Sequence, residues 1–164
     1  MTAQEIHDQI KTKFPEAILE FDDSVLQPFM KIAPNQLYAV CHYLRDEDTL
    51  DFDFLSCLSG VDQGETLATV YHLYSMRHKH KIVLKTEVAR EKPEIASVAD
   101  LWRTADWHER EAYDLFGIIY VNHPDLRRIL LPDDWEGYPL RKDYVEPDEY
   151  NGIQIKHPDM MKGE

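Results

Sequence analysis

Three carboxylates stand close together in the sequence and could serve as a general acid–base set: Glu109, Glu111 and Asp114. Such chemistry requires the acid and the base to converge on one substrate. On a helix each residue turns the chain by about 100°, so Glu109 and Glu111 face different sides. Arg110 and Asp114 are four residues apart, a spacing at which opposite charges stabilise a helix. We therefore predict that these side chains form salt bridges, within the fold or at an interface, and not a catalytic set.

Five histidines are candidate metal ligands: His72, His78, His80, His108 and His123. His78 and His80 would share one face of a strand, but both fall in a predicted turn with two basic neighbours. Positive charge there opposes the binding of a cation. His123 precedes a proline and is expected to order a turn. The histidine pattern therefore predicts no metal site.

Motifs for covalent catalysis or cofactor binding are absent from the sequence. No serine lies in a GxSxG elbow, and there is neither a GxGxxG motif nor a phosphate-binding loop with a lysine. Cys41 and Cys57 stand singly, without a CxxC, so cysteine alone can assemble neither an iron–sulfur cluster nor a zinc site. Both are expected to be small, buried core residues. The sequence predicts no cofactor in this chain.

Basic and aromatic side chains gather between residues 127 and 144 in the pattern of a binding surface. They are Arg127, Arg128, Trp135, Tyr138, Arg141, Lys142 and Tyr144, with Asp133 and Asp143 among them. Arginine, tyrosine and tryptophan carry much of the binding energy of interfaces when they are desolvated. The alternative is that Arg127 and Arg128 pair with Glu109, Glu111 or Asp133 inside the fold. Both can hold, because an arginine fixed by one carboxylate still has spare donors.

The first half of the chain predicts two helices and several strands. Residues 3–13 form a helix by pattern and residues 17–21 and 29–32 are short strands. A second helix begins at Pro34, with Leu37, Val40, Cys41 and Leu44 as its buried stripe. Residues 50–58 alternate between apolar and acidic positions, which is typical of a strand with one wet face. Residues 60–64 are a predicted turn, and the runs 67–76 and 81–89 predict a β-hairpin.

The second half predicts one more helix and then an extended chain. Ser97 and Asp100 have the spacing of a capping box that starts this helix. Apolar positions continue to Phe116, and Gly117 stands where a helix usually ends. A short apolar run, 118–121, and a turn, 122–125, follow, and prolines interrupt regular structure beyond. We predict an α+β fold with a small mixed or antiparallel sheet, helices packed on one face and an extended C-terminal segment. Residues 1–144 form one domain, and residues 145–164 form an extended or mobile tail.

The charge of the chain excludes some partners. It carries 18 basic and 31 acidic side chains, a net charge of −13. Nucleic acids and anionic bilayers are bound through lysine and arginine, so neither is an expected partner. Acidity of this degree serves solubility or docking against a more basic neighbour. No run of about 18 apolar residues occurs, so the chain is not expected to span a membrane.

Three stretches carry a resemblance to a known family. They are EREAYDLFGI (109–118), HPDLRRILLPDDWEG (123–137) and PLRKDY (139–144), with weaker matches at 55–62, 71–85 and 100–102. They resemble the 30 kDa subunit family of respiratory NADH:quinone oxidoreductase (complex I), which in bacteria is known as the C subunit. Two positions depart from the family pattern: Asn122 stands where glycine is expected, and Tyr138 stands where histidine is common.

The resemblance implies a function without redox chemistry in this chain. It implies a peripheral-arm subunit that braces the 49 kDa-type subunit near the quinone site, on the cytoplasmic side of the inner membrane. FMN and iron–sulfur clusters are expected only in partner subunits. The partner interface is expected to use Glu109, Arg110, Glu111, Asp114, Arg127, Arg128, Asp133, Trp135, Arg141, Lys142, Asp143 and Tyr144. The alternatives are the equivalent subunit of a related membrane-bound hydrogenase or other-donor complex and, in another class, a small free-standing hydrolase that uses Glu, Asp and His clusters.

Overall fold

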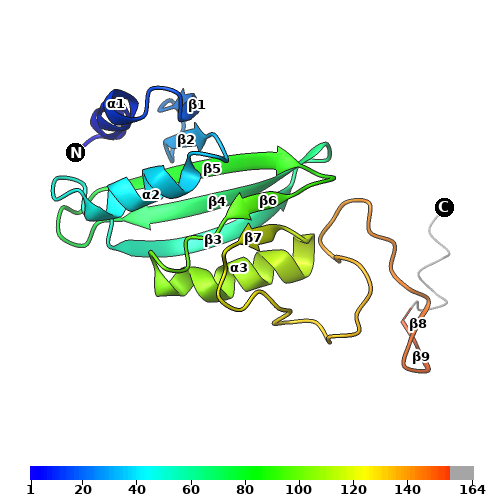
Figure 1. The fold of residues 1–164 in the computed structure, drawn as a ribbon. Helices are drawn as coiled ribbons and strands as arrows, with labels where there is room; N and C mark the ends of the chain where they lie inside the picture. The colour runs from blue at the N-terminus through cyan, green and yellow to red at the C-terminus, as the bar shows by residue number, and fades with distance from the viewer. Residues whose placement is uncertain (156–164) are drawn as a thin grey trace.

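A five-stranded sheet forms the centre of the molecule (Figure 1). The structure is a computed structural model that describes residues 1–155. The strands are β1 (Ile18–Asp22), β2 (Phe29–Ile32), β3 (Phe54–Asp62), β4 (Thr66–Tyr74) and β5 (Lys81–Ala89), in the spatial order β1-β2-β5-β4-β3. Neighbours are antiparallel except β2 and β5, which run parallel. The predicted mixed sheet and the β4–β5 hairpin are confirmed.

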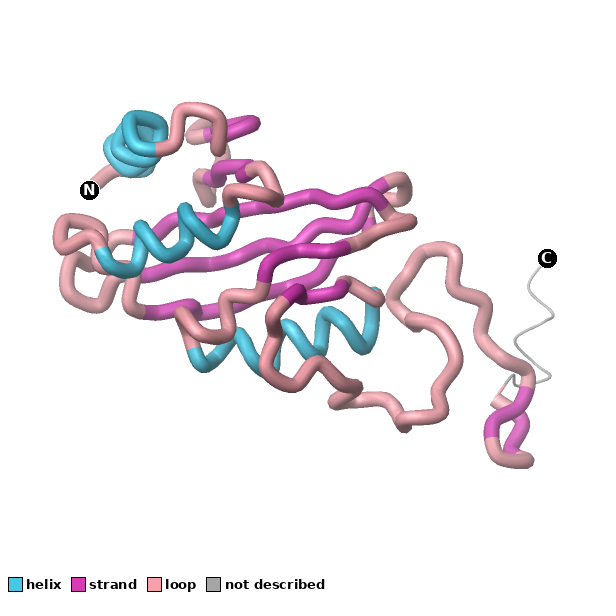
Figure 2. Tube along the Cα trace, in the orientation of Figure 1, coloured by secondary structure: helices cyan, strands magenta, loops and turns pink. Residues whose placement is uncertain are grey.

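Three helices cover one face of this sheet (Figure 2). They are α1 (Ala3–Lys13), α2 (Leu37–Asp46) and α3 (Arg103–Phe116). Thr2 and Glu5 form a capping box that begins α1. In α2, the predicted stripe of Leu37, Val40, Cys41 and Leu44 is buried. The inward-facing residues of β4 meet these helices, and Leu67, Tyr71 and Leu73 are all buried. The predicted packing of helices on one face is therefore confirmed.

The strand predicted at 50–58 corresponds to β3, which begins later, at Phe54, and ends later, at Asp62. Leu50 and Phe52 are fully buried, but they lie in an irregular stretch in which Phe52 N–H donates to the Leu44 carbonyl. Phe54 begins β3 and is 40% exposed on the other face. Asp51, with φ of 45°, turns the chain between Leu50 and Phe52. The predicted turn at 60–64 is also wrong, because Gly60 pairs with Thr69 in the ladder and the turn follows it.

The predicted capping box at Ser97 is wrong as well. Trp102 precedes α3, and no side chain caps the helix there. The Ser97 hydroxyl instead accepts from the Ala99 N–H and donates to the Glu109 carboxylate. This serine therefore orders the turn before the helix. The C-terminal end of α3 is as predicted, since Gly117 has φ of 70°.

Two two-stranded sheets and a long irregular segment complete the described part of the chain. Strands β6 (Glu94–Ala96) and β7 (Ile119–Val121) run parallel, and β8 (Glu149–Tyr150) pairs with β9 (Ile153–Gln154). Residues 122–148, all within the described part, form neither helix nor strand. The tail predicted at 145–164 thus includes the β8–β9 hairpin, and its last residues, 156–164, lie outside the described residues. Within residues 1–155, no helix has the length and apolar character to cross a bilayer.

Candidate functional site

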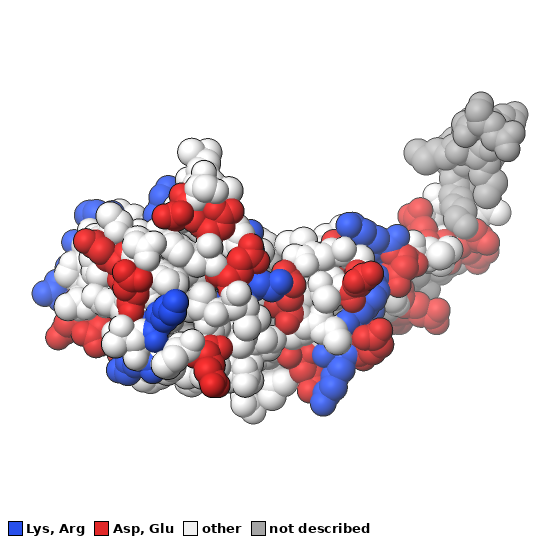
Figure 3. Space-filling view, turned by 90° about the horizontal axis from the view of Figure 1, so that it is seen from above, with Lys and Arg blue, Asp and Glu red and all other residues white. Residues whose placement is uncertain are grey.

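We call residues 122–148 the extended segment. It follows β7, passes α3 and leads to the β8–β9 hairpin (Figure 1). Loops of this length without secondary structure are uncommon in compact domains and are usually functional or disordered. Basic and acidic side chains crowd together at the end of the molecule where this segment lies (Figure 3). The residues that hold it in place decide what it can do.

Asp114 of α3 is the main attachment point of the segment. Its carboxylate is fully buried. One oxygen, Oδ2, accepts from the N–H groups of Ile129, Leu130 and Leu131 at 3.0, 2.7 and 2.9 Å. The other, Oδ1, accepts from Arg128 Nη1 at 2.7 Å. Burial opposes the charge of this carboxylate, but these four donors outweigh it and hold the pKa of Asp114 below its usual value.

Two arginines extend this attachment by binding backbone carbonyls. Arg128 donates from Nη2 to the carbonyls of Trp135 and Gly137, at 2.9 and 3.1 Å. Arg110, on α3, donates to the carbonyls of Arg127 and Arg128, at 3.2 and 3.0 Å. An irregular backbone has carbonyls that no ladder satisfies, and guanidinium groups supply several donors in a fixed plane. The two arginines therefore fix the path of the segment beside the helix.

A second attachment forms at the C-terminal end of α3. Arg141 donates from Nε to the Phe116 carbonyl at 2.6 Å, and its guanidinium lies 4.8 Å from the centre of the Tyr138 ring. Tyr138 covers Gly117 so closely that a Cβ there would lie 2.5 Å from the ring.

Asn122, which stands where glycine is expected, has φ of 68°. The departure from glycine at that position therefore keeps a left-handed backbone, which asparagine adopts more readily than most residues.

A third attachment joins the segment to the turn after β3. Asp62 is buried and accepts from Arg90 Nη1 and from the backbone N–H groups of Gly64 and Lys142, all at 2.7 to 2.8 Å. Arg90 also binds Asp143. Burial raises the pKa of Asp62, but the donors lower it further, to about 2. The position of Lys142 thus depends on a carboxylate that is far away in the sequence.

Glu109 is buried beside the start of the segment. Its carboxylate accepts from the Ser97 hydroxyl at 2.6 Å and from the Val98 N–H at 2.8 Å. His123 lies with Nε2 at 3.9 Å from Oε2 and accepts the Asp125 N–H on Nδ1, as expected of a turn residue. Burial raises the pKa of Glu109 to about 7. A raised carboxyl pKa is one mark of a catalytic acid, but this carboxylate is fully buried and held by structural donors.

The structure corrects the predicted pairing of the charged residues. Arg110 does not pair with Asp114, because Asp114 binds Arg128 and Arg110 binds carbonyls. Arg127 pairs with Asp125 on the surface, so neither Arg127 nor Arg128 pairs with the acids proposed for them. The opposite orientation of Glu109 and Glu111 is confirmed, since Glu111 is exposed.

The predicted interface residues divide into two groups by their exposure. The side chains of Glu109, Arg110 and Asp114 are buried and hold this chain's own segments. Arg128, Trp135, Arg141 and Tyr144 are partly buried, whereas Glu111, Arg127, Asp133, Lys142 and Asp143 are exposed. Contact of these residues with a partner stays a prediction, and the exposed ones are accessible to a partner, although Arg127 and Asp143 already form ion pairs within the chain.

Sequence reasoning missed the apolar side chains of the segment that face solvent. Leu130 is 63% exposed, Leu140 is 52% exposed and Val145 is more exposed still. Leu130 is exposed although its backbone N–H is bound to buried Asp114. An apolar side chain on a backbone held in this way is prearranged for contact with another surface. The missed signal is the leucine content of a stretch whose prolines exclude a helix or strand.

The clusters on which the hydrolase alternative depends do not form a metal site or line the groove on the sheet within the described residues. Among residues 1–155, no group of three or more His, Cys, Asp or Glu side chains could hold a metal ion. The apolar groove on the sheet has a volume of about 410 Å³ and is lined by no carboxylate. Cys41 is buried, which raises the pKa of its thiol, while Cys57 is only partly buried, contrary to expectation.

We expect Gly117→Ala to loosen the second attachment. The new Cβ would meet Tyr138 and, at 2.8 Å, Arg141 Nη2, and the left-handed backbone adds strain. The expected loss in the free energy of unfolding is about 2 to 3 kcal/mol in urea denaturation. The matched control is Gly64→Ala, at φ of 97° with nothing within 4 Å of the new Cβ. Equal losses in the two variants would show that Tyr138 does not rest on Gly117.

Comparisons with known proteins agree on one family. The family model described as respiratory-chain NADH dehydrogenase, 30 kDa subunit, matches residues 30–150. The chain is 47% identical over 151 residues to the C subunit of an NADH-quinone oxidoreductase from Chloroherpeton thalassium, covering 90% of this chain and 63% of the relative. It is 43% identical over 155 residues to the same subunit from Chlorobium phaeobacteroides, covering 92% of this chain and 93% of the relative. The chain thus spans less than two thirds of the first relative's length.

Two solved structures share the fold. A trypsin-resistant fragment of Nqo5 matches with a TM-score of 0.63 and 26% identity, covering 77% of this chain and 100% of the fragment. A chain of a membrane-bound sulfane sulfur reductase, an archaeal respiratory membrane complex, matches with a TM-score of 0.72, covering 87% of this chain and 85% of that one. At 23% identity the second match shows the fold alone.

Proposed function

Because the chain belongs to the family of the 30 kDa subunit of respiratory-chain NADH dehydrogenase, we propose that it is a non-redox structural subunit of the peripheral arm of a proton-translocating NADH:quinone oxidoreductase. In this role it braces the 49 kDa-type subunit near the quinone site. FMN and the iron–sulfur clusters belong to partner subunits. The complex places this chain on the cytoplasmic side of the inner membrane, as a peripheral protein.

The extended segment carries this proposal. Its backbone is bound to the carboxylates of Asp114 and Asp62, and its Arg141 side chain is bound to the Phe116 carbonyl. Leu130, Leu140 and Val145 are exposed. A free loop would lose conformational entropy on binding, whereas a segment already held in one path loses little. A prearranged apolar edge on a rigid domain is suited to fixing the position of a neighbour. Electron transfer depends on fixed distances between centres, so such a brace matters although it carries no electron.

The segment's charges favour a basic partner surface. Asp133, Glu136 and Glu146 are exposed on the same segment as the outward leucines, and the whole chain has a net charge of −13. Complementary charge speeds the encounter of two proteins and selects the right partner, while the apolar residues supply most of the affinity. A related complex with another electron donor is the second candidate, favoured by the fold shared with the sulfane sulfur reductase chain.

The proposal predicts that Leu130→Asp combined with Leu140→Asp blocks assembly. Both side chains are exposed, so the isolated variant keeps its fold, but two carboxylates would be buried at the interface. The expected result is at least a tenfold loss of assembled complex on native gels, since a buried unpaired charge costs several kcal/mol. The isolated variant should unfold at the same urea concentration as the parent chain.

The matched control is Leu19→Asp, which changes a leucine that is 60% exposed on β1, away from the segment. This variant should assemble normally. Intact complex in normal amount from the double variant would rule out the segment as the docking edge. Normal amount with lost turnover would contradict the structural role itself.

A further inference from the structure

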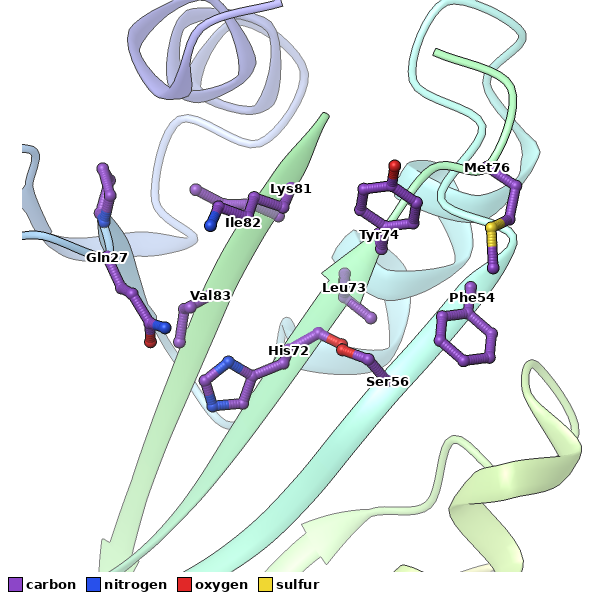
Figure 4. A pocket seen from close by; sticks show the side chains of 11 residues that line it. Gln27, Phe54, Ser56, His72, Leu73, Tyr74, Met76, Lys81, Ile82 and Val83 are labelled. Carbon is purple, nitrogen blue, oxygen red and sulfur yellow. The ribbon is translucent and has the colours of Figure 1, made fainter. Parts of the chain in front are cut away.

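The second face of the central sheet carries apolar side chains that no helix of residues 1–155 covers. Phe54, Tyr74 and Val83 lie on this face, on strands β3, β4 and β5 (Figure 4). The register of the ladders places Val70 on the same face. Antiparallel sheets with one wet face usually alternate between apolar residues inside and polar residues outside. We call this surface the open face. Its aromatic and aliphatic residues break that alternation, which is a mark of a surface that another molecule covers.

A groove of about 410 Å³ forms one end of the open face. Phe54, Val83 and Met76 supply apolar walls (Figure 4). Pro28, from the loop before β2, also lines the groove. Phe54 and Met76 are both more than a third exposed. Aromatic residues and methionine are enriched at the centres of protein interfaces, and methionine adapts to the shape of its partner. The groove therefore has the lining of a protein-binding pocket.

Four polar side chains of the groove have no partners of their own within residues 1–155, whereas the Ser56 hydroxyl donates to the His72 carbonyl. Within the described part of the chain, the side chains of Gln27, His72, Tyr74 and Lys81 make no hydrogen bond or ion pair. Each can donate a hydrogen bond, and the lysine ammonium can only donate. Lys81 is also the one charged residue among those that line the groove. An occupant that satisfies these donors must supply acceptors, and a carboxylate pairs best with Lys81.

Other lysines on the open face are already engaged. Lys31 pairs with Glu87 at 2.5 Å, and the Lys85 ammonium lies 3.2 Å from the centre of the Phe29 ring. Lys81 stands apart from both of these contacts. The chain as a whole has a net charge of −13, but the unpaired ammonium of Lys81 makes the groove locally positive. Charge complementarity therefore selects an acidic occupant.

We propose that the open face is a second docking surface, which binds an extended segment of a neighbouring protein chain. That segment inserts an aliphatic or aromatic side chain between Phe54 and Val83, and an adjacent aspartate or glutamate pairs with Lys81. A protein segment suits this surface better than a small molecule because the apolar strip continues past the groove to Val70 and Val61. The inference rests on the proposed function in one respect: the neighbour belongs to the same assembly.

Two surfaces on one rigid domain would place this chain between two neighbours. The open face is on the side of the sheet opposite the helices, whereas the extended segment is attached to α3 on the covered side (Figure 1). The sheet and α3 share one hydrophobic core, so a displacement at one surface is transmitted to the other. A protein with this arrangement bridges two neighbours across its own core.

Photo-crosslinking in the assembled complex tests the second surface. The photoreactive residue p-benzoylphenylalanine replaces Phe54, the complex is purified from its native membrane and irradiated, and the joined peptides are identified by mass spectrometry. We expect one peptide from another chain, with Asp or Glu within about three residues of the attachment point, as a strand's reach along the groove requires. Adding Lys81→Glu should lower the yield of this product roughly tenfold. The matched control, Lys79→Glu, changes a lysine that is exposed but outside the groove, and should leave the yield unchanged.

Other outcomes overturn the inference. Attachment within this chain, to a second copy of it, to a lipid or to a peptide without a nearby carboxylate would each do so, as would an unchanged yield with Lys81→Glu. The same photoreactive residue in place of Leu130 reports on the first docking surface, which is the extended segment. A product at Leu130 with none at Phe54 would refute the second surface and leave the proposed function standing. Absence of this chain from the purified complex would refute both.

Discussion

Asp114→Asn is expected to lower the free energy of unfolding by about 3 to 5 kcal/mol, which is the cost of removing one partner from a buried ion pair. In the parent chain one carboxylate oxygen accepts three backbone N–H groups and the other accepts Arg128. An amide has one oxygen and one NH2 group, so either Arg128 or the three N–H groups would face a donor. The arginine would also be left partly buried without its counter-charge.

Two measurements separate this loss from a general weakening. Urea denaturation gives the free energy, and hydrogen exchange at residues 129–131 shows whether the extended segment has detached. We expect those amides to lose most of their protection, while the amides of β4 and β5 keep theirs below the global transition. Glu111→Gln is the control, because Glu111 lies on the same helix and is exposed. Retained protection at 129–131 would show that Asp114 does not hold the segment.

The pH dependence of Asp114 has a definite sign. Its pKa in the folded state lies below the usual 3.8. The stability it contributes is therefore present above pH 3.8 and is lost as the pH falls through the folded-state pKa. Asp62, with a pKa of about 2, acts in the same direction. Both attachments of the extended segment should therefore hold at neutral pH and weaken only in strong acid.

Glu109→Gln is expected to remove an opposite pH dependence. Burial raises the pKa of Glu109 from 4.5 to about 7 in the folded state. Between these pH values the folded chain holds a proton that the unfolded chain has released, so stability falls as the pH rises. The shift corresponds to about 3 kcal/mol. Glutamine cannot ionise and can still accept from the Val98 N–H.

The test compares unfolding free energies of the two chains from pH 4.5 to pH 8. The parent chain should lose about 3 kcal/mol relative to the variant over this range. The groups that face Glu109 come from several elements: Ser97, Asp100, Asp106, His123, Cys41, Tyr71 and Tyr120. They are present in both chains, so the difference isolates the carboxyl group. Parallel profiles would show that Glu109 is ionised in the folded chain throughout. Glu111→Gln, on the solvent side of α3, should run parallel to the parent.

Local patterns in the sequence predicted most of the elements. The 3.6-residue period placed α1, α2 and the body of α3, and Gly117 marked the end of α3. The period of two placed β4 and β5, because alternation along a strand depends only on neighbouring residues. The same reasoning failed at Leu50, Phe52 and Phe54. Their alternation matched a strand, but the first two are buried by packing in an irregular stretch, which only tertiary contacts reveal.

Charged residues were harder to interpret than apolar ones. Arg110 and Asp114 have a helical pairing distance, yet each found a better partner in the extended segment. A buried carboxylate needs a hydrogen-bond donor for each of its oxygens, and only the folded chain brings such donors together around it. Asp62, Arg90 and Asp143 illustrate the same limit, since they are distant in sequence and meet only in the folded chain.

The sequence by itself determined the family, the α+β class, the order of the main elements and the stretch where charge and aromatic residues concentrate. These follow from residue types and from spacings of a few residues, which a linear chain displays directly. Only the tertiary structure decided which charged residues form ion pairs and hydrogen bonds within the chain, which leucines face outward and which face of the sheet is left open. Burial and pairing are properties of residues brought together across long separations, and no local period encodes them.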